Sequence, residues 1–201
     1  MMEKTNIEEL KEFSKSTNRV MAAKEVPYPL SGIRTFRKYR SWVYIPNNSE
    51  NTSFFIWYND PYAIIGLPKI YCGAFIPLSS SLNSKINIRI RNILDKLNFF
   101  SNGASIKIGN KRIDKKLIIS GNMNSSERKL FTQPMIQDKL LEVLNDEPFM
   151  NISLNENNVD FVPELRNTPY LSIINPQKWI FDKKVIERIF MQIEEIRNLI
   201  N

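Results

Sequence analysis

The chain has 201 residues, with 28 Lys and Arg, 21 Asp and Glu and no histidine, so its formal net charge is +7 at pH 7. Hydrophobic residues make up 42% and charged residues 24%, which is close to the average of globular domains. A chain of this length buries enough surface to fold without disulfides or structural metals. We therefore expect a basic protein with one globular domain over residues 1–201.

The absence of histidine excludes several kinds of active site. Histidine is the usual general base at neutral pH, so the chain holds no Ser-His-Asp or Cys-His pair. An HExxH zinc helix and a His-ligated haem are excluded as well. The single cysteine, Cys72, has no partner for an internal disulfide or a CxxC pair. Because Cys72 lies in an apolar run, we expect a buried, inert thiol.

The glycines and the apolar windows exclude further classes of protein. The six glycines are too far apart to form a GxGxxG or GxxxxGK[ST] phosphate loop, and no cofactor is expected. The most apolar window, residues 62–78, contains Pro68, Lys69 and Pro77 and falls short of the roughly 20 residues that a transmembrane helix needs. With one cysteine and no apolar signal-peptide core, the sequence predicts a cytoplasmic location.

The first expected element is a short N-terminal helix. Ile7, Leu10 and Phe13 share one face at helical spacing, and Thr5 or Asn6 can cap the helix. Residues 1–25 are then a candidate helical arm. A Pro-rich connector follows at residues 26–32, because each proline disfavours helix in the residue before it.

The middle of the chain has the patterns of β-strands. Residues 41–45 and 54–58 are β-branched and aromatic and flank a turn-rich loop, which predicts a hairpin. The second of these segments is apolar on both faces, as in a central, covered strand. Further strands are expected at residues 69–76 and at residues 86–91, where apolar and polar side chains alternate.

The following segments predict more hairpins. Residues 105–108 and 111–113 flank Gly109 and Asn110, which suit a tight β-turn, and residues 117–120 continue the sheet. Residues 149–154 and 159–162 suggest another hairpin, and a last strand is expected at residues 170–174.

Two helices are expected in the C-terminal half. Pro134 suits a first helical turn, and apolar residues of 134–145 share a face. A long helix is expected from about residue 182 to residue 201. Together these elements predict an α+β fold with a mostly antiparallel sheet of hairpins, a short N-terminal helix, a mid-chain helix and a long C-terminal helix.

A basic-aromatic segment makes nucleic acid one candidate partner. Cations bind phosphate groups and aromatic rings stack on unpaired bases. Further cations of later strands would extend this surface if the strands are neighbours. The candidate nucleic-acid-binding residues are Arg34, Arg37, Lys38, Tyr39, Arg40, Trp42, Arg89, Arg91 and Lys107.

A loose D…ExK pattern suggests a carboxylate-metal hydrolase as a further hypothesis. Asp114 precedes Glu127 and Lys129, and two carboxylates could hold Mg²⁺ beside a lysine. However, residues 124–127 look like a capped helix start, and the ExK of such a site belongs on an apolar strand. The pairs Asp146-Glu147 and Asp160-Glu164 are interpreted as solvated loop charges.

The C-terminal helix carries an isoleucine seam with heptad-like spacing. Its broad apolar face favours packing in the core, whereas a narrow seam would favour a homodimer contact. The candidate partner-interface residues are Ile186, Ile189, Ile193, Ile196 and Ile200.

By elimination, the sequence predicts a non-catalytic binding or adaptor domain that acts on a macromolecular partner, with a protein as the first candidate. The alternative is a nucleic-acid-binding module that uses the basic-aromatic surface. The third hypothesis is the carboxylate-metal hydrolase.

Overall fold

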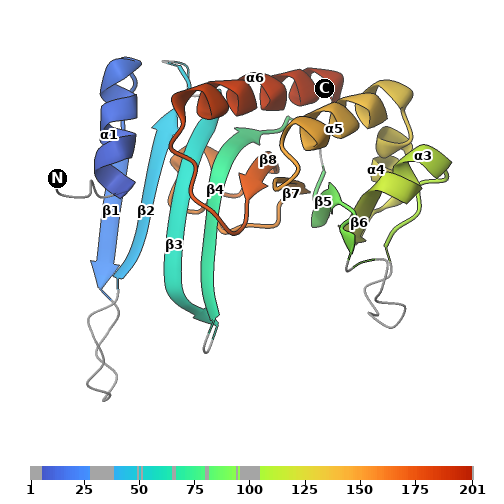
Figure 1. Ribbon diagram of the computed structural model, residues 1–201, viewed down its shortest axis with the longest axis horizontal. Coiled ribbons are helices and arrows are strands. Elements are labelled where there is room, and N and C mark those ends of the chain that lie inside the picture. The colour runs from blue at the N-terminus through green and yellow to red at the C-terminus, as the bar shows by residue number, and fades with distance from the viewer. Residues whose placement is uncertain are drawn as a thin grey trace. The chain divides into compact units, whose positions relative to one another are not determined.

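Figure 1 shows a computed structural model of the chain, and it describes residues 6–27, 39–48, 50, 52–64, 67–79, 82–93, 95 and 105–200. The strands are β1 (Ala22–Pro27), β2 (Tyr39–Pro46), β3 (Phe54–Ile64), β4 (Leu67–Pro77), β5 (Ile86–Ile90), β6 (Leu117–Gly121), β7 (Asn151–Leu154) and β8 (Tyr170–Asn175). The helices are α1 (Asn6–Ser16), α3 (Lys111–Lys116), α4 (Ser125–Phe131), α5 (Pro134–Asp146), α6 (Lys183–Ile200) and the 3₁₀ turn η1 (Pro163–Leu165).

The strands form one sheet with the order β1-β2-β3-β4-β8-β7-β5-β6. The neighbour pairs β1–β2, β2–β3, β5–β6, β5–β7 and β7–β8 are antiparallel. The predicted α+β class with an antiparallel sheet is therefore confirmed. The chain divides into two compact units, one of Met1–Ala74 with Asn175–Phe190 and one of Phe75–Ile174 with Met191–Asn201.

The first unit contains the β2–β3 hairpin that the sequence predicts. Val43 of β2 pairs with Trp57 of β3, and the side chains of β2 alternate between buried and half-buried positions. Residues 54–58 of β3 are all buried, which confirms a strand covered on both faces. The Cys72 thiol of β4 is buried as expected, and burial raises its pKa to about 12.

The N-terminal segment is a helix followed by a strand. Leu10 and Phe13 of α1 are buried, in agreement with the predicted apolar face. Residues 22–27, which the sequence assigns to the arm and to the start of the connector, form β1 and pair with β2. Pro27 is the last residue of β1, a position where a missing backbone N–H is tolerated. Residues 28–32 of the expected connector lie outside the described residues.

Arg19 joins three segments of the first unit. Its Nη1 and Nη2 donate to both carboxylate oxygens of Glu187 in α6, at 2.5 and 2.8 Å. Its Nε and Nη2 donate to the backbone oxygen and to Oδ1 of Asn47, both at 2.8 Å. The guanidinium also lies 5.5 Å from the ring centre of Phe13 and 5.3 Å from that of Phe190. The sequence analysis missed this ion pair, because its partners are 168 residues apart.

The second unit confirms two predicted helices. α5 begins at Pro134 and buries Ile136, Leu140, Leu141 and Leu144 on one face. α4 begins after Asn124, whose side chain accepts from the Glu127 backbone N–H, while the Glu127 carboxylate accepts from the Asn124 backbone N–H. This reciprocal pair is a capping box.

The hairpin predicted around Gly109 and Asn110 is wrong. The residues that follow form α3, because Asn110 Oδ1 accepts from the backbone N–H groups of Arg112 and Ile113 and so caps a helix. Asn suits a tight turn and a helix N-cap equally well, and only the tertiary context selects between them.

A second predicted hairpin is also wrong, at residues 159–162. Val159 and Val162 are buried there, but they lie in a turn that leads into η1. Pro163 begins η1, and proline at a first helical position favours this short helical turn over a continued strand. The other half of the predicted hairpin, residues 149–154, does contain a strand, β7. The predicted strand at residues 170–174 is confirmed as β8.

The predicted C-terminal helix is α6. Ile186, Ile189, Ile193 and Ile196 are at most 1% exposed, and Ile200 is half-buried. The structure thus places four of the five candidate interface residues in the core of the chain. Among the described helices, none combines the length and the apolar character that crossing a bilayer requires.

Candidate functional site

The predicted basic-aromatic segment is described only in part. Arg34, Arg37 and Lys38 lie outside the described residues, and Tyr39 is described only through its backbone in β2. The remaining candidates fall into two groups: Arg40 and Trp42 belong to the first unit, whereas Arg89, Arg91 and Lys107 belong to the second.

In the first unit, Arg40 is engaged by a buried carboxylate. Its Nε donates to Asp60 Oδ2 at 2.8 Å, and the Tyr58 hydroxyl donates to the same oxygen at 3.1 Å. Beside this pair, Lys24 Nζ lies 5.8 Å from the centre of the Trp42 ring. A cation over an aromatic ring is a favourable contact within the chain. Asp60 thus offsets the positive charge of Arg40.

Arg89 is neutralised in a similar way. Its two terminal nitrogens each donate to one oxygen of Asp95 at 2.6 Å, in a bidentate pair. This hydrogen bonding lowers the pKa of Asp95 to about 2, so the carboxylate is ionised at neutral pH. Arg89 is therefore a poor candidate for a phosphate ligand.

Arg91 and Lys107, in contrast, are brought together. Arg91 Nη2 and Lys107 Nζ both donate to the backbone oxygen of Asp114 in α3, at 3.3 Å each. The Arg91 backbone N–H donates to the Lys116 oxygen at 2.8 Å, which places the end of β5 beside the end of α3. Arg128 of α4 donates to the Lys107 backbone oxygen at 2.6 Å.

These contacts gather cations from four segments around α3. The side chains of Lys107, Lys111, Lys115, Lys116 and Arg128 are exposed, and that of Arg91 is half-buried. Figure 1 shows α3 running directly into β6, with α4 following next in the chain. We call this set the α3 cluster: Arg91, Lys107, Lys111, Lys115, Lys116 and Arg128.

The two carboxylates of the D…ExK pattern bind backbone amides. Asp114 Oδ1 and Oδ2 accept from the N–H groups of Ile108 and Gly109, at 3.1 and 3.2 Å. Glu127 is fully buried, and its Oε1 accepts from the Ser84 N–H at 3.1 Å while its Oε2 accepts from Asn124. Among the residues that the structure describes, no group of three or more acidic or cysteine side chains could hold a metal ion. Both carboxylates therefore have structural partners.

Replacing Glu127 with Gln is expected to lower the free energy of unfolding by about 1–3 kcal/mol, the cost of an unsatisfied buried donor. The carboxylate accepts from two backbone N–H groups, and the amide nitrogen of Gln would face one of them as a second donor. Chemical denaturation followed by circular dichroism measures the change.

The exposed Glu156→Gln is the matched control and should leave stability within about 0.5 kcal/mol. An unchanged stability of Glu127→Gln would contradict the structural role. Metal-dependent turnover that Glu127→Gln and Asp114→Asn both abolish would instead support the hydrolase hypothesis.

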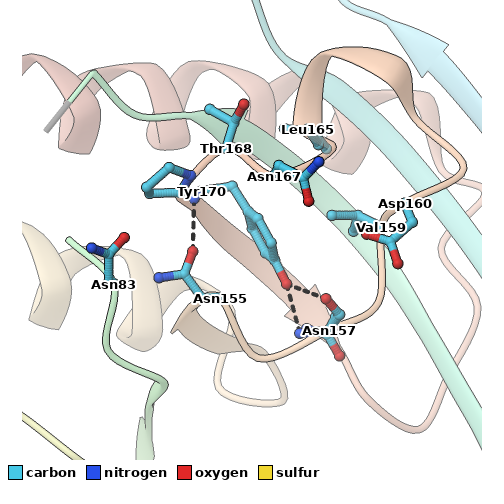
Figure 2. Close-up of a pocket in the computed structure, with 10 residues that line it drawn as sticks. Asn83, Asn155, Asn157, Val159, Asp160, Leu165, Asn167, Thr168 and Tyr170 are labelled. Atoms are coloured by element: carbon cyan, nitrogen blue, oxygen red, sulfur yellow. Dashed lines mark hydrogen bonds between the residues drawn. The ribbon is translucent and has the colours of Figure 1, made fainter. Parts of the chain in front are cut away.

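A polar pocket of about 250 Å³ lies beside β8 (Figure 2). Tyr170 stands at its centre: its hydroxyl accepts from the Asn157 N–H at 2.7 Å and donates to the Asn157 oxygen. Burial raises the pKa of Tyr170, so the hydroxyl stays protonated at neutral pH. Figure 2 also shows Asn155, whose Oδ1 accepts from the Tyr170 N–H at 2.9 Å.

The polar groups around this pocket mostly satisfy one another. Asn155 Nδ2 donates to the backbone oxygens of Leu82 and Ser84, at 2.7 and 3.1 Å. Asn155 and Asn167 have φ values of +50° and +57°, which asparagine tolerates better than most residues. Asp160 is the charged residue of the lining. The lining of the pocket therefore offers no positive charge to an anion. The sequence analysis did not predict this pocket, and the one sequence feature that marks it is the number of asparagines in its lining.

Comparison of the chain with protein-family models, with curated proteins and with solved structures found no match in any of the three.

Proposed function

We propose that the protein is a non-catalytic binding domain that acts on an anionic macromolecular partner through the α3 cluster. The observation that supports this is the imbalance of charge there. The cluster holds six positive side chains, and a further cation of α3, Arg112, is paired with Asp138 at 2.9 Å. Asp114 offsets one charge and is held by two backbone amides.

Placing cations close together has an electrostatic cost. Like charges repel over distances up to the Debye length, which is about 8 Å at physiological ionic strength. α3 contributes three of these cations within six residues. Acidic side chains three or four residues away on the helix would relieve the repulsion, but Asp114 is the one acidic residue of α3. A polyanion removes the repulsion, and the field of such a patch also raises the rate of encounter with an anionic partner.

Binding without catalysis is supported by the chemistry of the remaining side chains. The chain has no histidine, and the two carboxylates of the metal pattern are engaged by backbone amides. We also propose a cytoplasmic location, because the lone Cys72 is a buried thiol with no second cysteine to pair with.

The proposal is tested by retention on immobilised heparin, a sulfated polyanion that has no bases. A variant with Lys111, Lys115 and Lys116 changed to Gln, the α3 triple, is expected to elute at clearly lower salt than the unmodified protein. The reason is that it loses three of the six positive charges of the cluster. The salt concentration at elution is the measurement.

The matched control is a triple with Lys11, Lys15 and Lys184 changed to Gln. These lysines are also exposed but lie in α1 and α6 of the first unit. Both triples lower the net charge equally, so only a local site separates them. Equal elution of the two triples would show that net charge alone governs retention, and the proposal would then fail.

A further inference from the structure

We infer that the partner of the α3 cluster is a nucleic acid, bound through its phosphate groups and not through its bases. This inference rests on the proposed function, because it names the partner of the same surface. Three features of the cluster support it: the chemistry of its exposed surface, the restraint of its charged groups, and their spacing.

The exposed surface of α3 favours phosphate over an acidic protein. Four of its six residues are exposed Lys or Arg, of which Arg112 is paired with Asp138, while Asp114 is half-buried and Ile113 faces the core. Neither α3 nor α4 exposes a large hydrophobic side chain. Protein interfaces are depleted in lysine and depend on buried aromatic or apolar anchors. Phosphate contacts, in contrast, are made mainly by Lys and Arg.

Three cations of the cluster are fixed by neutral acceptors. Arg91, Lys107 and Arg128 each donate to a backbone carbonyl oxygen, so their positions are restrained by acceptors that carry no formal charge. Arginine has five N–H donors and lysine three, so each group keeps donors for a ligand. Restraint before binding lowers the entropy lost when a ligand binds. Arg89 differs from these three cations, because its guanidinium is held by the charged carboxylate of Asp95.

The spacing of the α3 lysines suits a phosphate chain. Lys111 and Lys115 are four residues apart and therefore lie on one side of the helix, about 6 Å apart along its axis. Measured along the axis of a DNA duplex, the phosphates of one strand follow one another every ~3.4 Å. The strand winds around this axis, so its neighbouring phosphates lie further apart than that, and the two lysines can contact successive phosphates. The restrained Arg91, Lys107 and Arg128 extend the positive surface.

The described residues of α3 and α4 expose no aromatic side chain on which a base could stack: α3 contains none, and Phe131 of α4 is buried. Proteins that hold single strands, in contrast, stack bases on aromatic rings. We therefore expect binding that depends on the charge density of the nucleic acid and hardly on its sequence.

The test is fluorescence anisotropy with a labelled 20-base-pair DNA duplex over a range of salt concentrations. The unmodified protein is expected to bind, and the α3 triple is expected to flatten the plot of log K against log salt by about 2.7, since each lost duplex contact contributes about 0.9. At about 0.1 M salt this corresponds to a roughly 500-fold loss of affinity. The control triple is expected to keep the slope of the unmodified protein.

Three further measurements decide between sources of anionic charge. A second duplex of scrambled sequence should bind equally, and labelled poly-glutamate should bind at least tenfold more weakly. A single strand that binds more than tenfold tighter than the duplex would show that bases are stacked, which overturns the inference. Equal or tighter binding of poly-glutamate would overturn it in favour of an acidic protein.

The two proposals fail separately. If heparin retention depends on the α3 cluster but DNA does not bind, the partner is not a nucleic acid and the binding function stands. If the α3 triple behaves like the control triple on heparin, the function itself is wrong. Circular dichroism melting checks that each variant is folded. If the α3 triple is unfolded, the single variant K115E is used in its place and is expected to weaken DNA binding. An unchanged affinity of K115E for DNA would overturn the inference.

Discussion

Replacing Ile193 with Ala is expected to lower the free energy of unfolding by about 2–5 kcal/mol, the range for truncating a buried aliphatic side chain. Ile193 is fully buried in α6, so the smaller side chain removes apolar contacts and leaves a cavity. Denaturant titration followed by circular dichroism gives the change, because a shift of the midpoint at constant slope reports stability directly.

Met191→Ala is the matched control for Ile193→Ala. Met191 is two residues away in the same helix and is 60% exposed, so its truncation should change stability by less than about 0.5 kcal/mol. An unchanged stability of Ile193→Ala would contradict the packing of α6. If that variant also lost a dimer in sedimentation, the isoleucine seam would serve the homodimer contact that its spacing allows.

Replacing Arg19 with Met is expected to lower the free energy of unfolding by about 2–4 kcal/mol. Removing one partner of a buried ion pair costs about 3–5 kcal/mol, and the value here is discounted because the Glu187 side chain is 35% exposed and water screens it. The variant also leaves the Asn47 carbonyl oxygen without the Arg19 donor. Arg19→Lys, which keeps the charge but not the bidentate geometry, should lose less.

The same ion pair gives stability a dependence on pH. The Arg19 guanidinium lowers the pKa of Glu187 from its ordinary value of 4.5. Stability from a lowered carboxyl pKa is present above the unfolded value and is lost as pH falls through the folded value. The unmodified protein should therefore lose its advantage over Glu187→Gln below about pH 4.5. A constant difference between pH 7 and pH 3 would contradict the contribution of this pair.

The elements that the sequence predicted correctly are those whose signal is local. Apolar periodicity gave α5 and α6, the continuous apolar run gave β3, and Asn124 marked the start of α4. The errors fell where one local signal fits two structures. Asn110 suits both a β-turn and a helix cap, and Val159 and Val162 are apolar and β-branched although they lie in a turn.

The candidate site was predictable only as a set of charges. Arg91 and Lys107 could be proposed from composition, but their meeting at the Asp114 carbonyl oxygen depends on α3, which the sequence analysis missed. The ion pair between Arg40 and Asp60 could not be predicted from the sequence either. Asp60 is buried, but the sequence around it does not distinguish a buried carboxylate from a solvated one. The charge of a residue is visible in the sequence, but its compensation is a property of the fold.

The position of β1 bears on how the protein behaves at high concentration. Among the described strands, β1 comes first in the sheet and has β2 as its one neighbour, so its outer edge is a template on which another chain could add a strand. Lys24 and Glu25 are exposed on this strand, and Pro27 ends it without an N–H group. In an antiparallel, two-fold symmetric pairing of two β1 strands centred on residue 24 or 25, like charges would face each other. The strand thus resists growth of the sheet from one molecule into the next, which protects the protein from edge-to-edge aggregation.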